Sequence, residues 1–171
     1  MPAIYVCPLA HLAATVRATG ARHIATLINA GTNVPRPESV PAENHLFLGL
    51  NDISMEVDGM ILPGEEHIAR FVAFVEEWDR KAPLVVHCWA GISRSTAGAF
   101  TAYCALRPDV SEEVVARRLR ARSPQATPNA RIVALADQYL KREGRMVAAI
   151  EGIGRGANAF EGNVFALRID E

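Results

Sequence analysis

The chain has 171 residues, of which 50% are hydrophobic, and its 18 basic and 19 acidic side chains give a net charge of −1. This length suits one domain with a sizeable hydrophobic core. The balanced charge argues against a strong overall attraction to nucleic acid or to an anionic membrane, so we expect neither as a partner. The sequence also predicts no secretory leader and no membrane-spanning helix.

The N-terminal part of the chain predicts three strands and one helix. The strands are expected at residues 4–6, 23–29 and 45–50, and the helix at residues 9–19. The first strand is short and lies just before Pro8, which favours an edge position in a sheet. Gly20 is a typical end for the helix, and three prolines make residues 31–41 a loop.

The C-terminal part of the chain alternates between helices and strands. Helices are expected at residues 65–80, 95–106 and 129–142, with a further one that begins at Ser111, and strands at residues 84–88 and 164–169. Residues 84–88 are apolar enough for burial on both faces of a sheet. The glycine-rich residues 151–162 predict a loop. Together the elements predict an α/β fold with a central, mostly parallel sheet flanked by helices.

The segment between residues 84 and 96 carries the predicted chemistry. Its strand ends at Cys88, a loop of five residues follows, and Arg94 and Ser95 begin the next helix. A loop before a helix N-terminus collects unpaired backbone N–H groups, and with the positive end of the helix dipole these bind anions. The Arg94 guanidinium can hold two phosphate oxygens at once. Positive potential at Cys88 favours its nucleophilic thiolate, so we expect a phosphate bound above a cysteine nucleophile.

The full pattern is His87-Cys88-x-x-Gly91-x-x-Arg94-Ser95. It resembles the signature loop of the cysteine-dependent protein tyrosine phosphatase superfamily, in its compact dual-specificity and tyrosine phosphatase branch. Looser similarity runs in order through residues 20–142. The resemblance implies hydrolysis of protein phosphotyrosine, with phosphoserine and phosphothreonine as further substrates, through a cysteinyl-phosphate intermediate. The expected chemistry needs no cofactor and no metal, and the spacing of potential ligands suggests no metal site.

The resemblance and the loop chemistry together give the expected roles in phosphate binding and transfer. Cys88 is the predicted nucleophile. The phosphate oxygens are expected to bind Arg94 and the backbone N–H groups of Trp89, Ala90, Gly91, Ile92, Ser93 and Arg94. The family pattern gives Ser95 a hydrogen bond to the sulfur, which makes the sulfur a better leaving group. A plain helix-start hydroxyl is the alternative for Ser95.

The remaining expected site residues lie outside the loop or at its start. Asp52 follows the strand at residues 45–50, where the family carries its general acid, and Glu56 and Asp58 are the alternatives in the same loop. His87 is expected to organise the signature loop by hydrogen bonding. Asn129 either positions the site or only caps the helix after it.

Two other functions stay open. A phosphoinositide or RNA 5′-phosphatase would favour cations inside the loop, and residues 89–93 contain none. A non-catalytic phosphate-binding module would be expected to lack Cys88, Arg94 or the acid. The Trp89 side chain either forms an aromatic wall beside the substrate or packs beneath the loop.

The three cysteines, Cys7, Cys88 and Cys104, are widely separated and odd in number. This pattern predicts a reducing compartment, and we expect the cytoplasm. Residues 1–171 are expected to form a single phosphatase domain, with residues 145–171 as a C-terminal extension. The extension either adds an edge strand or lies near the active site.

Overall fold

The computed structural model describes residues 2–171 and contains a five-stranded sheet with the strand order β3-β2-β4-β1-β5. The strands are β1 (Ala3–Pro8), β2 (His23–Ile28), β3 (His45–Gly49), β4 (Leu84–Cys88) and β5 (Phe165–Arg168). Strands β1 to β4 are parallel, whereas β5 is antiparallel to β1. The carboxyl ends of the four parallel strands therefore share one edge of the sheet, where sites form in such folds. This architecture confirms the predicted fold class.

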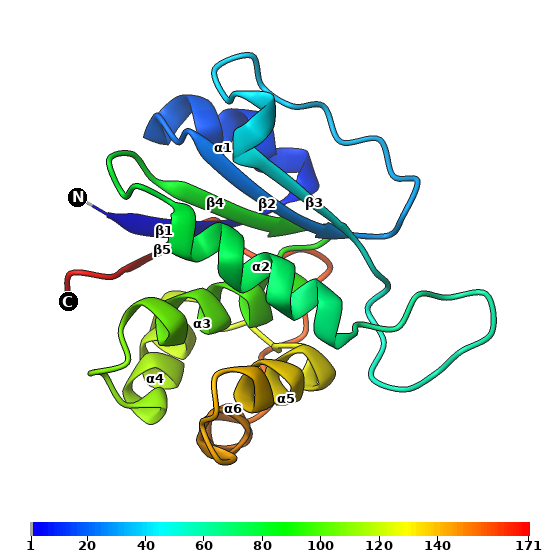
Figure 1. Cartoon of the computed structure of the whole chain (residues 1–171), viewed down its shortest axis with the longest axis vertical. Coiled ribbons are helices and arrows are strands. Elements are labelled where there is room, and N and C mark those ends of the chain that lie inside the picture. The colour runs from blue at the N-terminus through cyan, green and yellow to red at the C-terminus, as the bar shows by residue number, and fades with distance from the viewer. Residues whose placement is uncertain (1) are drawn as a thin grey trace.

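Six α-helices flank the sheet: α1 (Leu12–Thr19), α2 (Glu65–Glu77), α3 (Arg94–Leu106), α4 (Glu112–Arg122), α5 (Ala130–Tyr139) and α6 (Arg145–Ile153). Helix α1 lies on one face of the sheet, and α2 to α6 lie on the other (Figure 1). Two apolar clusters fill these layers. Leu12 and Val16 of α1 pack with Val85, whereas the larger cluster contains Val86 and Phe100. Neighbouring β4 residues face opposite sides of the sheet, which explains this division.

Close packing of α3 against β4 fixes the position of the helix N-terminus. All eleven residues from Arg94 to Cys104 are buried. A Cβ atom added at Gly98 would lie 3.1 Å from Val86 Cγ1, so a larger residue would push the helix away from the sheet. The first turn of α3 is thereby held beside the carboxyl end of β4.

The structure corrects three sequence predictions. Strand β1 is not an edge strand, because β5 from the C-terminus pairs with its outer side. The helix predicted at residues 9–19 begins with a 3₁₀ turn at Leu9–His11. Helix α6 was not predicted, and residues 151–153, expected in a loop, form its last turn. The apolar residues of α6 follow a helical spacing, but the helix is short and lies between glycines, so the sequence alone did not indicate a helix there.

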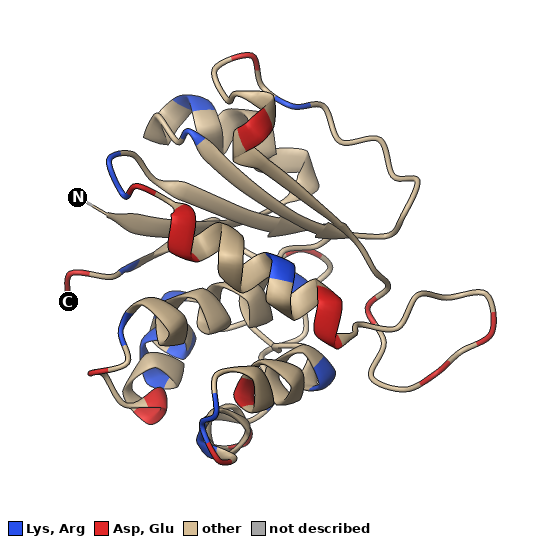
Figure 2. Ribbon diagram, viewed as in Figure 1, with Lys and Arg blue, Asp and Glu red and all other residues tan. Residues whose placement is uncertain are grey.

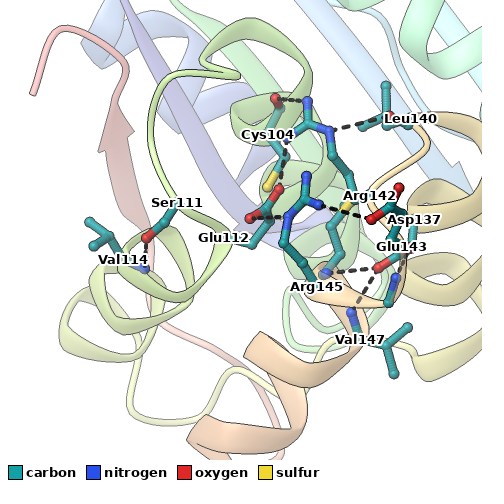
Figure 3. Close-up of polar contacts among 12 residues, drawn as sticks. Cys104, Ser111, Glu112, Val114, Asp137, Leu140, Arg142, Glu143, Arg145 and Val147 are labelled. Carbon is teal, nitrogen blue, oxygen red and sulfur yellow. Dashed lines mark hydrogen bonds and ion pairs between the residues drawn. The ribbon is translucent and has the colours of Figure 1, made fainter.

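A buried polar network holds the start of α6 against α4 and α5 (Figure 3). The carboxylate of Asp137 accepts hydrogen bonds from the backbone N–H groups of Gly144, Met146 and Val147. Glu112 in the first turn of α4 pairs with Arg142 at 2.9 Å and with Arg145 at 3.3 Å. Arg142 also donates to the Cys104 carbonyl at 2.8 Å. The hydrogen bonds to Asp137 thus cap a helix whose N-cap residue, Gly144, has no side chain to do so.

Charged side chains lie on the helices and loops, whereas β1 to β4 contain no Lys, Arg, Asp or Glu (Figure 2). The outer helices carry both basic and acidic residues, in agreement with the net charge of −1. Across residues 2–171, no helix is both long and apolar enough to cross a membrane.

Candidate active site

The loop between β4 and α3 wraps around the Cys88 side chain. Cys88 is the last residue of β4, and α3 begins at Arg94. Gly91 has a φ of +71°, and a Cβ atom there would lie 2.8 Å from the Pro8 backbone nitrogen. Only glycine fits both requirements. The loop can therefore turn back towards the sulfur, and the Gly91 N–H points at Cys88 Sγ from 3.3 Å.

Ser95 lies beneath the same sulfur. Its hydroxyl oxygen is 3.1 Å from Cys88 Sγ, and both residues are buried. The hydroxyl can accept from a thiol or donate to a thiolate. With the Gly91 N–H, two donors can thus reach a negatively charged sulfur. Ser95 is therefore within hydrogen-bond distance of the predicted nucleophile.

The Arg94 guanidinium is held from one side only. Its Nη1 donates to Asn29 Oδ1 at 2.8 Å and to the Leu50 carbonyl at 2.9 Å, at the carboxyl ends of β2 and β3. Its Nε is buried and has no hydrogen-bond partner among residues 2–171. A buried donor without a partner is costly, and an anion at this position would satisfy it. The sequence reasoning missed Asn29, although its place after β2 marks the same edge of the sheet.

Asp52 is the acidic residue of its loop that contacts the signature loop. Its Oδ1 accepts hydrogen bonds from Ser93 Oγ at 2.7 Å and from Asn129 Nδ2 at 2.9 Å. The alternatives Glu56 and Asp58 are exposed, as Asp52 is, and all three belong to the segment between β3 and α2, much of which extends away from the body of the protein (Figure 1). Asp52 is thus the carboxylate that the structure brings to the predicted phosphate site.

Asn129 contacts both the helix that follows it and Asp52. Its Oδ1 accepts from the Ile132 N–H and caps α5, while its Nδ2 donates to Asp52. Its backbone N–H donates to the Ser93 carbonyl at 3.1 Å, and the Thr127 N–H donates to the Ile92 carbonyl at 2.9 Å. The segment before α5 therefore supports the far side of the signature loop.

His87 takes part in a chain of side chains behind the loop. Its Nε2 lies 2.7 Å from Thr26 Oγ1, which in turn lies 2.7 Å from His45 Nε2, so the chain links β4, β2 and β3. Burial lowers the pKa of His87 to about 4, although its contact with the Cys88 carbonyl opposes the shift. A neutral His87 fits the expected organising role. Thr26 and His45 were not predicted, because their contact depends on strand order.

The C-terminal extension reaches the signature loop as well as the sheet. The Gly162 N–H donates to the Ala90 carbonyl at 2.8 Å, and the Gly156 N–H donates to Thr127 Oγ1 at 3.0 Å. Arg155 lines a hollow together with Asp52 and Ser93. Trp89 is 60% exposed, so its side chain does not pack beneath the loop. Both alternatives for residues 145–171, an edge strand and a place near the site, are thus realised.

Fold and site together describe an α/β protein whose predicted phosphate-binding loop joins a central strand to a helix. The sequence matches the family model of protein-tyrosine phosphatase over residues 59–140. Human dual specificity protein phosphatase 16 is 34% identical over 107 residues, which are 62% of this chain. The chain spans only 15% of the length of that relative.

Solved structures share the fold. A mouse putative dual specificity phosphatase complexed with zinc tungstate has a TM-score of 0.62 at 20% identity, over 86% of either chain. The human tyrosine phosphatase-like serine/threonine/tyrosine-interacting protein has a TM-score of 0.64 at 18% identity, over 82% of this chain and 92% of its own. By sequence over residues 59–140 the chain is similar to protein-tyrosine phosphatases, and it shares its fold with dual specificity phosphatases.

Proposed function

We propose that the chain hydrolyses phosphate monoesters, with protein phosphotyrosine as the main substrate, through a cysteinyl-phosphate intermediate. One observation carries the proposal. The Cys88 sulfur receives the Gly91 N–H and lies against Ser95, beside an arginine whose buried Nε lacks a partner among residues 2–171. This arrangement offers a nucleophile and an unsatisfied donor to the same anion.

In the first step, the Cys88 thiolate attacks phosphorus and the bond to the leaving oxygen breaks. Loop N–H groups and Arg94 bind the three equatorial oxygens, where charge is spread in the transition state. Asp52 gives its proton to the leaving oxygen, so the substrate departs as a neutral alcohol or phenol. The hydrogen bonds from Ser93 and Asn129 fix the position of the Asp52 carboxyl group.

In the second step, Asp52 is a carboxylate and takes a proton from water as that water attacks phosphorus. The sulfur–phosphorus bond breaks, and Cys88 leaves as a thiolate while inorganic phosphate forms. The Ser95 hydroxyl, 3.1 Å from the sulfur, donates to the departing thiolate. Asp52 thus recovers the proton that it gave in the first step, and the cycle closes.

The same proposal covers the extent and setting of the enzyme. Residues 1–171 act as one phosphatase unit, in which residues 145–171 contribute to the site. The nucleophile must be a reduced thiol, which suits a reducing compartment such as the cytoplasm.

Phosphate release from matched phosphotyrosine and phosphoserine peptides, without added metal, tests the proposal. Wild type is expected to act on phosphotyrosine, Cys88→Ser to be inactive, and Asp52→Asn to lose about 10²- to 10⁴-fold in kcat. Asp58→Asn is the matched control, because it removes an exposed carboxylate of the same loop. We expect that control to behave as wild type. Comparable phosphoserine turnover would establish dual specificity.

Three results would contradict the protein phosphatase proposal. If the enzyme hydrolysed phosphoinositides or RNA 5′-phosphates but neither phosphopeptide, its substrate would not be protein. Tight phosphopeptide binding without any turnover by folded, reduced protein would make the chain a binding module. Equal losses in Asp52→Asn and Asp58→Asn would remove Asp52 as the general acid.

A further inference from the structure

Residues 154–164, the C-terminal arm, cross the signature loop between α6 and β5. The arm is attached at two points: the Ala157 N–H donates to the carbonyl of Pro124, which follows α4, at 2.9 Å, and the Gly162 N–H donates to the Ala90 carbonyl of the signature loop at 2.8 Å. A Cβ atom at Gly162 would lie 2.7 Å from the Gly91 carbonyl oxygen, so the two backbones touch. The arm is therefore built against the loop.

A hollow of about 450 Å³ opens between the arm, the start of the 3₁₀ turn and the signature loop. Its lining residues are Leu9, Ala10, Trp89, Ala90, Phe160 and Glu161. Most of this lining is apolar, and the carboxylate of Glu161 is engaged by His11 at 2.9 Å. The hollow is therefore suited to a neutral, apolar occupant rather than to a cation or a second phosphate.

Two aromatic side chains stand exposed beside the hollow. Phe160 is 99% exposed and Trp89 is 60% exposed. Clustered exposed aromatic groups mark binding surfaces more often than isolated ones do, and buried aromatic anchors dominate recognition energies. Burial of the Phe160 ring contributes almost no stability to the described part of the chain, because the residue is almost fully exposed to solvent. An occupant that covers both rings would remove this apolar area from water.

We propose that this hollow is a substrate subsite for an apolar side chain that lies next to the phosphorylated residue of a protein substrate. The inference rests on the proposed function and names its substrate class more closely. Trp89 and Ala90 line the hollow and also belong to the loop that would bind the phosphate. Because the hollow adjoins that loop, the apolar side chain is assigned to a position that flanks the phosphotyrosine in the substrate.

A cycle of two enzymes and two peptides tests the subsite. One phosphotyrosine peptide carries leucine at the flanking positions, and its partner carries serine there. Phe160→Ala is expected to lower kcat/KM for the leucine peptide about tenfold, or about 1.4 kcal/mol. The serine peptide, and a small aryl phosphate that has no flanking residues, are expected to keep their wild-type rates. Tyr139→Ala, a 48% exposed aromatic residue on α5, is the matched control.

The outcomes separate this inference from the proposed function. If the enzyme turns over the aryl phosphate, the subsite is overturned when Phe160→Ala changes kcat/KM equally for both peptides or for neither. Absence of turnover on every substrate would instead contradict the proposed function. In that case, calorimetric binding of the leucine peptide decides the subsite: affinity must fall in Phe160→Ala, and unchanged affinity overturns it. The subsite would also be overturned if the protein bound plain phosphatidylcholine vesicles through Phe160 and bound both peptides with equal affinity.

Discussion

Arg142→Met tests whether the buried network at α6 holds the C-terminal extension in place. Arg142 and Glu112 are 2.9 Å apart, and their side chains are only 10% and 7% exposed. Methionine keeps much of the length of the arginine stem but removes the charge and the hydrogen bond to the Cys104 carbonyl. Glu112 would then keep Arg145 as its remaining cationic partner at 3.3 Å.

Removal of one partner from a buried ion pair costs about 3–5 kcal/mol, because the other charge stays buried without compensation. Since Arg145 still contacts Glu112, we expect the lower end, about 3 kcal/mol of the free energy of unfolding. The measurement is urea unfolding at pH 7, followed by circular dichroism. Arg117→Met is the matched control, because the Arg117–Glu113 pair is 65% and 72% exposed and is expected to contribute below about 1 kcal/mol.

The pH dependence gives a second readout of the same network. Burial alone would raise the pKa of Glu112, but hydrogen bonds from its own backbone, Arg142 and Arg145 outweigh burial and lower that pKa. A carboxyl group with a lowered pKa stabilises the fold at pH values above its ordinary pKa of about 4.3, and this stabilisation is lost as the pH falls through the folded-state pKa. The difference between wild type and Arg142→Met should therefore shrink in acid. Equal stability of Arg142→Met and Arg117→Met at pH 7 would refute the reasoning.

Four further predictions concern the site. Gly91→Ala should lose at least about 1–2 kcal/mol of stability by urea unfolding, because alanine at positive φ is strained and its Cβ would meet the β1 backbone; a fully stable variant would contradict this. The pKa of His87 is lowered to about 4 in the folded protein, so below its ordinary value of about 6.5 the unfolded chain binds a proton at His87 that the folded protein does not. The free energy of unfolding should therefore fall as the pH drops from about 6.5 to about 4. That slope should be shallower in His87→Gln. Ser95→Ala should slow hydrolysis of the cysteinyl-phosphate intermediate more than its formation, which stopped flow would detect as a larger burst of phenol. An unchanged burst would exclude the role assigned to Ser95. Asn129→Ala should lose about 1 kcal/mol of stability with its helix cap and should lower kcat, whereas an unchanged kcat would leave Asn129 as a cap alone.

The signature loop was predictable because its chemistry is local. Cys88, Arg94 and Ser95 lie within eight consecutive residues, and the strand before them and the helix after them follow from apolar patterning. Asp52 was predictable for a related reason, since carboxyl ends of parallel strands meet at one edge of a sheet. The family resemblance added which carboxylate to choose, and the contacts of Asp52 with Ser93 and Asn129 agree with that choice.

The contacts that escaped prediction join residues distant in sequence. Asn29 meets Arg94 across 65 positions, and Thr26 meets His87 across 61. Neither pairing follows from periodicity, because both need the order β3-β2-β4. Strand β1 looked like an edge strand for the same reason, since its second partner comes from the opposite end of the chain. Helix α6 depends on Asp137, a side chain of the preceding helix, to cap its first turn.

The most direct test of the central claim is to trap the phosphoryl group on the enzyme. Wild type, Asp52→Asn and Cys88→Ser would be mixed with a phosphotyrosine peptide that carries the radiolabel on its phosphate, quenched within the first turnover and digested for mass spectrometry. The account predicts label on the peptide that contains Cys88, more of it in Asp52→Asn than in wild type if the second step is slowed more than the first, and none in Cys88→Ser. Turnover with no labelled enzyme, or label on a different residue, would contradict it.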